Sequence, residues 1–173
     1  MFRSLEMAYQ ASTMPFKNHS TIYDVGSSVS LWVSAFEILS HPQKGKASLS
    51  SVLKLLGGYD WNDKILKRKT YIVKYGGKSY KVSLAEKLYK ELYDTRNDFL
   101  HGNPVTDKRL YPFKNKNLPL LIRFAPILYK IALLYFLDKF KSKRRSKKAK
   151  LEELTAKIFN ERNLSDALLK AKQ

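Results

Sequence analysis

Apolar residues recur along the chain at helical spacing. The clearest case is residues 21–40, where apolar side chains return every three or four positions and predict one buried helix face. This face comprises Ile22, Val25, Val29, Trp32, Val33, Phe36 and Leu39. Thr21 can cap the start of this helix, and Pro42 prevents its continuation. Comparable patterns predict further helices over residues 2–12, 48–56, 83–101, 118–140 (with a kink at Pro126) and 151–173.

The apolar period changes from helical to alternating between residues 70 and 82. Tyr71, Val73 and Tyr75 alternate with polar neighbours, and Tyr80 and Val82 do the same after Gly76-Gly77. Two alternating runs joined by two glycines predict a β-hairpin. An isolated hairpin is weak, so we expect it to pack on the helices.

Helix boundary signals surround the segment that follows the hairpin. Ser83 and Glu86 have the spacing of a capping box at a helix start, whereas Gly102 and Pro104 are typical of the positions just beyond a helix end. The sequence therefore predicts an all-α fold, a bundle of four to six helices with a small β-hairpin insert at about 70–82. We divide it into a helical domain over 1–140, a basic linker over 141–150 and a C-terminal helix over 151–173.

The charge of the chain is strongly positive. Lys and Arg number 33 against 15 acidic residues, which gives a formal charge of +18. Residues 139–150 hold eight basic residues and no acid, so they supply +8 and leave +10 for the rest. Such a charge indicates an anionic partner, with a soluble surface as the simpler alternative. Within this run, we expect an RNA backbone to be bound by Lys143, Arg144, Arg145, Lys147 and Lys148.

Several kinds of chemistry find no support in the sequence. There is no cysteine, which excludes disulfides, thiolate metal ligands and a cysteine nucleophile. His19, His41 and His101 lack ligand spacing, so we expect no metal and no cofactor. A P-loop at 76–79 would need an earlier glycine where Ile72 stands.

The longest apolar run does not suit a membrane span. Residues 124–137 form a run of 14 residues that contains Lys130, short of the ~20 residues that a span requires. The first ten residues include Glu6 and lack the apolar core of a signal peptide. We therefore expect a cytoplasmic protein without a membrane partner.

The strongest chemical signal is the segment LYDTRNDFLHGNPV, residues 92–105. His101 can exchange a proton near neutral pH, Arg96 can hold a phosphate by two hydrogen bonds, and Asn97 can orient either group. Two interpretations remain open. These residues are an RNA-cleaving site, or they form an ordinary helix end in which His101 bonds the last carbonyls and Arg96 pairs with Asp94 or Glu91.

This segment resembles the HEPN superfamily, whose defining motif is an Arg followed by a His, with a polar residue after the Arg. Arg96, Asn97 and His101 occupy these places. The upstream helix that carries Glu37, the variable insert and Gly102-Asn103-Pro104 resemble the ApeA-like branch, which is associated with bacterial anti-phage defence. The resemblance spans roughly residues 20–140.

The resemblance implies a helical bundle that dimerises and joins two Arg/His sets in one cleft. Many HEPN proteins are metal-independent endoribonucleases that act as toxins or in abortive infection, and others are non-catalytic. We therefore predict a homodimeric ribonuclease with Arg96, Asn97 and His101 as catalytic residues. Glu37 either orients Arg96 or His101 or is a simple surface carboxylate.

The aromatic residues Tyr89, Tyr93 and Phe99 beside the motif favour a dimer interface. Two alternatives to the ribonuclease remain. The first is a non-catalytic basic module that binds RNA or a partner protein. The second is one component of an assembly with a cognate antitoxin or sensor protein.

Overall fold

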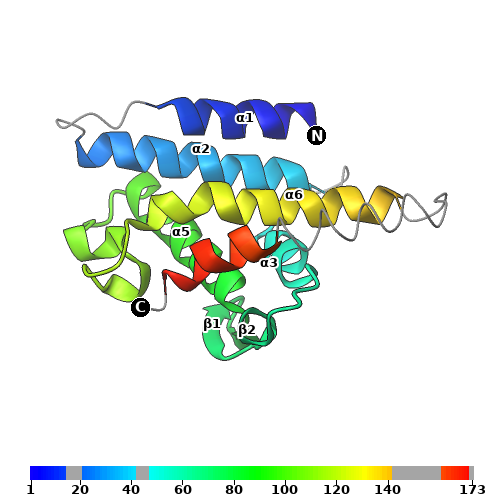
Figure 1. Ribbon diagram of the computed structural model, residues 1–173. Coiled ribbons are helices and arrows are strands. Elements are labelled where there is room, and N and C mark those ends of the chain that lie inside the picture. Colours follow the sequence, from blue (N-terminus) through cyan, green and yellow to red (C-terminus); the bar gives the residue numbers. More distant parts are fainter. Residues whose placement is uncertain (15–20, 42–46, 142–160, 172–173) are drawn as a thin grey trace.

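The computed structural model describes residues 1–14, 21–41, 47–141 and 161–171. The chain forms an all-α bundle with one small antiparallel hairpin, as the sequence predicts (Figure 1). The elements of the bundle are α1 (Phe2–Thr13), α2 (Ile22–Ser40), α3 (Leu49–Gly57), α4 (Lys64–Lys67), β1 (Tyr71–Tyr75), β2 (Lys78–Val82), α5 (Leu84–Leu100) and α6 (Ala125–Lys141). Three 3₁₀ turns lie between α5 and α6, at Asp107–Leu110, Pro112–Lys114 and Leu121–Phe124.

Helix α2 lies at the centre of the packing, with α1 on one side and α5 and α6 on the other. Val33 and Phe36 are fully buried on its inner face, whereas Ile22, at the N-terminal end of the same stripe, is exposed. Thr21 caps this helix as predicted, and Asp24 completes a capping box. The Phe36 ring contacts the Tyr89 ring of α5 at 4.7 Å between centroids. An aromatic contact therefore joins the two helices that carry the candidate site.

The hairpin prediction is confirmed. β1 pairs with β2 from Tyr71–Val82 to Tyr75–Lys78. Gly76 and Gly77 form the turn with φ of +55° and +74°, a region that glycine enters without strain. Val73 and Val82 are buried, so the hairpin packs on the helices rather than standing alone.

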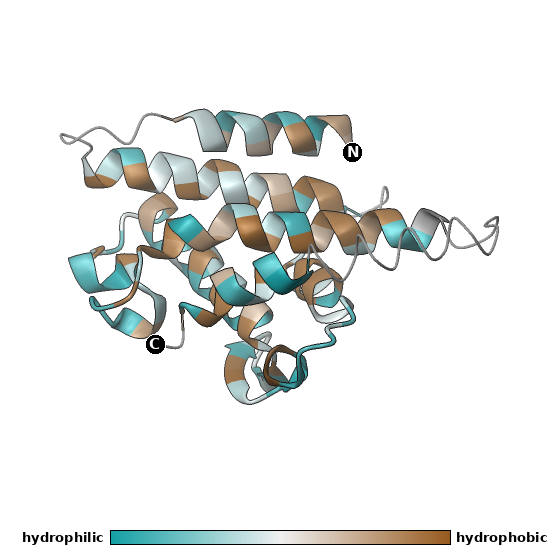
Figure 2. Ribbon diagram, in the orientation of Figure 1, coloured by the Kyte–Doolittle hydropathy of each residue, from teal (hydrophilic) through white to brown (hydrophobic). Residues whose placement is uncertain are grey.

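The predicted kink at Pro126 is wrong. The 3₁₀ turn Leu121–Phe124 leads into α6, which begins at Ala125, so Pro126 lies in the first helical turn. A proline is accommodated there because the first backbone N–H groups have no partner within the helix. Figure 2 shows that hydrophobic residues run along α6, and Leu128 and Ile131 are fully buried. None of the helices in the described ranges is long and apolar enough to span a bilayer.

The end of the chain belongs to the same core. Residues 161–169 are helical, and Leu164, Leu168 and Ala171 join the hydrophobic cluster of the bundle. The Glu161 carboxylate accepts hydrogen bonds from the backbone N–H and the side-chain amide of Asn62, the latter at 2.8 Å. The segment that the sequence division sets apart from the helical domain thus contributes buried residues to it.

Candidate active site

Helix α5 carries the motif residues at its C-terminal end. Ser83 caps its start in a capping box with Glu86, which fixes where the helix begins. At the other end His101 is the capping residue, and its backbone N–H donates to the Asn97 carbonyl at 2.9 Å. Gly102 follows with φ of +67°, the left-handed conformation that commonly ends a helix.

An ion pair between α2 and α5 is the centre of the site. The Arg96 Nη2 atom lies 2.7 Å from Glu37 Oε2, and Arg96 Nη1 donates to Asn97 Oδ1 at 3.1 Å. The side chains of Arg96 and Glu37 are 18% and 20% exposed, so solvent screens their attraction only partly. The guanidinium also lies 5.4 Å from the centroid of the Tyr93 ring. Glu37 therefore holds the Arg96 side chain in one orientation.

The other partners considered for Arg96 are engaged elsewhere. Asp94 forms an ion pair with Lys90 at 2.5 Å, and Glu91 forms one with Lys87 at 3.1 Å. The predicted pairing of Arg96 with Asp94 or Glu91 is therefore wrong, and Glu37 is the carboxylate that pairs with Arg96.

His101 stands apart from this group of side chains. It is exposed, and among the described residues none gives its imidazole a hydrogen bond or an ion pair. Its backbone, and not its ring, satisfies the last helical carbonyls. Five residues along a helix advance about 7.5 Å and turn about 140°, which accounts for its separation from Arg96. The structure brings together Glu37, Arg96 and Asn97 and leaves His101 free at the adjoining helix end.

The aromatic residues beside the motif do not share one surface. Tyr89 is fully buried, so the expectation that it helps to form an exposed interface is wrong, whereas Tyr93 and Phe99 are partly exposed. The Phe99 ring packs against Gly26 of α2. None of the described residues hydrogen-bonds to the Tyr89 hydroxyl. Burial raises its pKa well above the usual value, and the nearby Glu37 charge raises the pKa further.

Sequence reasoning missed two contacts at the site, because it assigned Tyr93 only to a dimer interface and did not name Arg109. Tyr93 lies one turn before Arg96, a spacing that places both on one helix face. Arg109 donates from Nε to Asp98 Oδ2 at 2.8 Å, which ties the loop after His101 back to α5. The three-residue spacing of Tyr93 and Arg96 could have predicted their contact. The Arg109–Asp98 pair depends on the path of the loop, so the sequence alone could not predict it.

The predicted tail contacts cannot be placed in the site. Lys143, Arg144, Arg145, Lys147 and Lys148 lie outside the described residues. Within the described part of the chain, no group of three or more His, Asp and Glu side chains is positioned to hold a metal ion.

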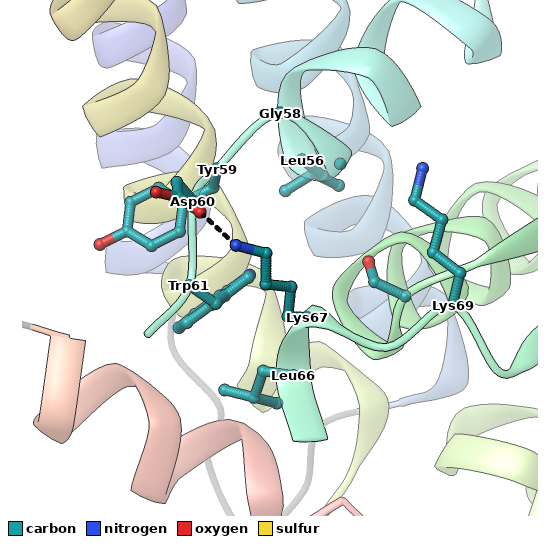
Figure 3. Close-up of a pocket in the computed structure, with 10 residues that line it drawn as sticks. Leu56, Gly58, Tyr59, Asp60, Trp61, Leu66, Lys67 and Lys69 are labelled. Carbon is teal, nitrogen blue, oxygen red and sulfur yellow. Dashed lines mark hydrogen bonds and ion pairs between the residues drawn. The ribbon is translucent and has the colours of Figure 1, made fainter. Parts of the chain in front are cut away.

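A pocket of about 250 Å³ lies at the opposite end of α5 from His101 (Figure 3). It is lined by Ser83, the N-cap of α5, by residues of α3, α4 and the segment between them, and by Lys69, which follows α4. Figure 3 shows Lys67 reaching toward Asp60, with a 2.9 Å ion pair between them. Because α5 is about 25 Å long, this pocket is separate from the Glu37–Arg96 pair.

Comparison of the chain with family models, with curated proteins and with solved structures found no match. The fold and the site geometry therefore carry the functional argument.

Proposed function

We propose that the protein is a metal-independent endoribonuclease of the HEPN type, acting in defence or as a toxin. The observation that carries the proposal is the arrangement at the end of α5. Arg96 is oriented by Glu37 and Asn97, and an exposed His101, whose ring has no hydrogen-bond partner among the described residues, follows at the end of the same helix. An oriented cation on the same helix end as an imidazole, which can take or give a proton, suits phosphodiester cleavage.

Arg96 would stabilise the reacting phosphate. A guanidinium has five N–H donors, and two of those on Arg96 are used by Glu37 and Asn97. The remaining donors are available to phosphate oxygens. Because Glu37 fixes the side chain, little rotational freedom is left to lose when a phosphate binds.

His101 would transfer protons. In the proposed reaction a base takes the proton of the RNA 2′-hydroxyl, the 2′-oxygen attacks phosphorus, and the 5′-oxygen leaves with a proton from an acid. The products are a 2′,3′-cyclic phosphate and a 5′-hydroxyl. One chain supplies one His101, so the proposal includes a homodimer whose second His101 provides the other proton transfer.

The homodimer is testable by itself. Light scattering should give about twice the 20.1 kDa of one chain. A monomer at every workable concentration would contradict this part of the proposal. The basic run over residues 139–150 would add RNA affinity without reading sequence, since its charges suit phosphates and it lacks a group for proton transfer.

A non-catalytic binding module is the second candidate function. The observation that favours it is the ion pair itself, because Arg96 has a carboxylate partner and joins α2 to α5 as a structural residue would. In this case the positive charge of the protein would bind RNA or a partner such as a cognate antitoxin or sensor protein, and His101 would have no role.

The deciding experiment is cleavage of total RNA by the purified protein in chelator. The wild type should cut RNA and leave DNA intact, with a bell-shaped rate profile around neutral pH. Arg96→Ala and His101→Ala should each lower the rate by about 100-fold or more. The matched controls are Lys108→Ala and Asn103→Ala, exposed residues near the helix end that should retain the rate. A fully active His101→Ala protein, or cleavage that requires magnesium, would favour the binding module.

A further inference from the structure

A second concentration of positive charge lies within the folded domain. Residues 64–81 contain seven basic residues and no acidic residue. We call this set the basic hairpin: Lys64, Lys67, Arg68, Lys69, Lys74, Lys78 and Lys81. Together with the eight basic residues of 139–150 it accounts for +15 of the formal charge of +18. Nearly all of the excess charge is thus in two segments, and one of them is folded.

The basic hairpin spans α4, the two strands and the segment between α4 and β1. Four of its members lie on α4 or in the segment that joins α4 to β1, and three lie on the strands. All seven side chains are exposed. Among the described residues only Lys67 has a carboxylate partner, Asp60 at 2.9 Å, in a pair that is largely exposed. The other six basic residues, which have no carboxylate partner in the described part of the chain, are therefore left for an external anion.

Strand register determines where the lysines face. Ile72 pairs with Lys81 and Lys74 with Ser79, so these four residues share the outer face of the hairpin. Val73 and Val82 lie on the opposite, buried face. Lys78 is next to the Gly76-Gly77 turn. Lys74 and Lys81 therefore lie on the outer face, whereas Lys78 lies on the other face, at the end of the hairpin beside the turn.

An aromatic pair lies on the other face of the hairpin together with Lys78, since Tyr75 pairs with Lys78 and Tyr80 pairs with Val73. The Tyr75 and Tyr80 rings stack at 4.3 Å between centroids and 18° between planes. Tyr80 is 38% exposed, so part of this stack is open to solvent. Lys78 shares the face of Tyr80, two positions along β2, and Lys74 and Lys81 line the other side of the same narrow hairpin. Cations close to an accessible aromatic ring are the combination that binds single-stranded nucleic acid, because phosphates pair with the cations and bases stack on the ring.

The pocket at the start of α5 adjoins the same surface. Lys67, Lys69 and Trp61 are among the residues that line it. Figure 3 shows Lys69 on the side of Lys67 away from Asp60. Asp60 also lines the pocket and pairs with Lys67, so Lys69 gives this concave place a net positive charge beside the hairpin.

We propose that the basic hairpin binds the backbone of single-stranded RNA, with a base stacking on Tyr80. The choice of RNA over DNA rests on the proposed function, whereas the binding does not require that Arg96 and His101 be catalytic. An anionic membrane is less well matched. The exposed large apolar side chains of this segment are Ile65 on α4 and Ile72 and Tyr80 on opposite faces of the hairpin, so Ile72 and Tyr80 cannot insert among lipids together.

Helix α5 sets the geometry of such a complex. The hairpin precedes its N-terminus and His101 caps its C-terminus, about 25 Å away. This distance corresponds to about seven stacked nucleotides at ~3.4 Å each. An RNA strand bound at the hairpin would thus be able to reach His101 at the C-terminal end of α5. The affinity for RNA should rise with oligonucleotide length up to about seven nucleotides and should not rise further for longer oligonucleotides.

The test measures binding of a fluorescent 2′-O-methyl RNA 12-mer, which has no free 2′-hydroxyl for the proposed cleavage. The full chain is compared with the triple variant Lys74→Thr/Lys78→Thr/Lys81→Thr, in which threonine preserves strand propensity. The matched control is Arg3→Ser/Lys108→Ser/Lys170→Ser, which removes the same charge from dispersed exposed positions. Circular dichroism verifies that both variants remain folded.

The triple hairpin variant should lower the slope of log K against log salt by about 2 and weaken binding by about 100-fold at 0.1 M salt. The control should change the slope by less than half as much. Tyr80→Ser should weaken binding by about tenfold and leave the slope unchanged, because stacking releases no counterions.

Equal slopes and affinities for the hairpin variant and the control would overturn the proposal. So would an unchanged RNA affinity accompanied by loss of binding to phosphatidylserine vesicles or to poly-glutamate, since the hairpin would then serve a different class of partner. Failure of the ribonuclease is detected separately: it would abolish cleavage of ordinary RNA and leave binding of the 2′-O-methyl strand intact.

Discussion

Removing the charge of Glu37 should destabilise the contact between α2 and α5. In Glu37→Gln the amide oxygen can still accept a hydrogen bond from Arg96, so the substitution isolates the effect of charge. Two unit charges about 4 Å apart near a protein surface attract by about 4 kcal/mol, and desolvation offsets much of this. Exposed pairs contribute about 0.2–1 kcal/mol, whereas breaking a buried pair costs about 3–5 kcal/mol. The Arg96 and Glu37 side chains are 18% and 20% exposed, so we expect the contribution of their ion pair to lie between the values for exposed and buried pairs.

We therefore expect Glu37→Gln to lower the free energy of unfolding by about 1–2 kcal/mol. For a domain of this size, that corresponds to a fall in Tm of about 3–6 °C. Urea denaturation followed by circular dichroism measures the effect. A cycle with Arg96→Gln and the double variant should give a coupling energy of about 1–2 kcal/mol.

The Asp60–Lys67 pair is the matched control. Its atoms lie 2.9 Å apart, but its side chains are 69% and 66% exposed, so a cycle with Asp60→Asn and Lys67→Gln should give less than about 0.5 kcal/mol. If the two cycles return the same coupling energy, partial burial does not strengthen the Glu37–Arg96 pair, and the claim that Glu37 fixes Arg96 fails.

Three other substitutions test the packing and the buried hydroxyl groups. Gly26→Ala should destabilise the fold by about 1–3 kcal/mol, because a β-carbon would lie 2.7 Å from the Phe99 ring, while Ser27→Ala on the exposed side should be neutral. Tyr89→Phe should change the free energy of unfolding by less than about 1 kcal/mol, since no described residue bonds the hydroxyl; a larger loss would reveal a partner. Burial, reinforced by nearby carboxylates, raises the pKa of Tyr59 to about 12, so the folded state keeps a proton that the unfolded chain loses near pH ~10. Stability should fall as pH rises from 10 to 12, and Tyr59→Phe should make that fall shallower in urea titrations.

Local signals in the sequence were enough to predict most elements of the fold. The Gly-Gly turn, the Ser83 cap and the helical spacing in α2 each act over a few residues, and the structure has them where they were expected. Pro126 shows the limit of such signals. A proline is compatible with a kink within a helix or with the first turn of a helix. Here the 3₁₀ turn Leu121–Phe124 precedes α6, so Pro126 lies in the first turn.

Which side chains meet at the candidate site depended on tertiary structure. The sequence determined that Arg96, Asn97 and His101 lie at one helix end, because helical spacing and Gly102 act locally. Only the packing of α2 against α5 decided that Glu37, 59 positions earlier, would be the partner of Arg96. The same packing buried Tyr89, which looks no different in sequence from the partly exposed Tyr93. Helical periodicity determines which residues share a face, but which neighbouring helix covers that face depends on how the whole chain packs.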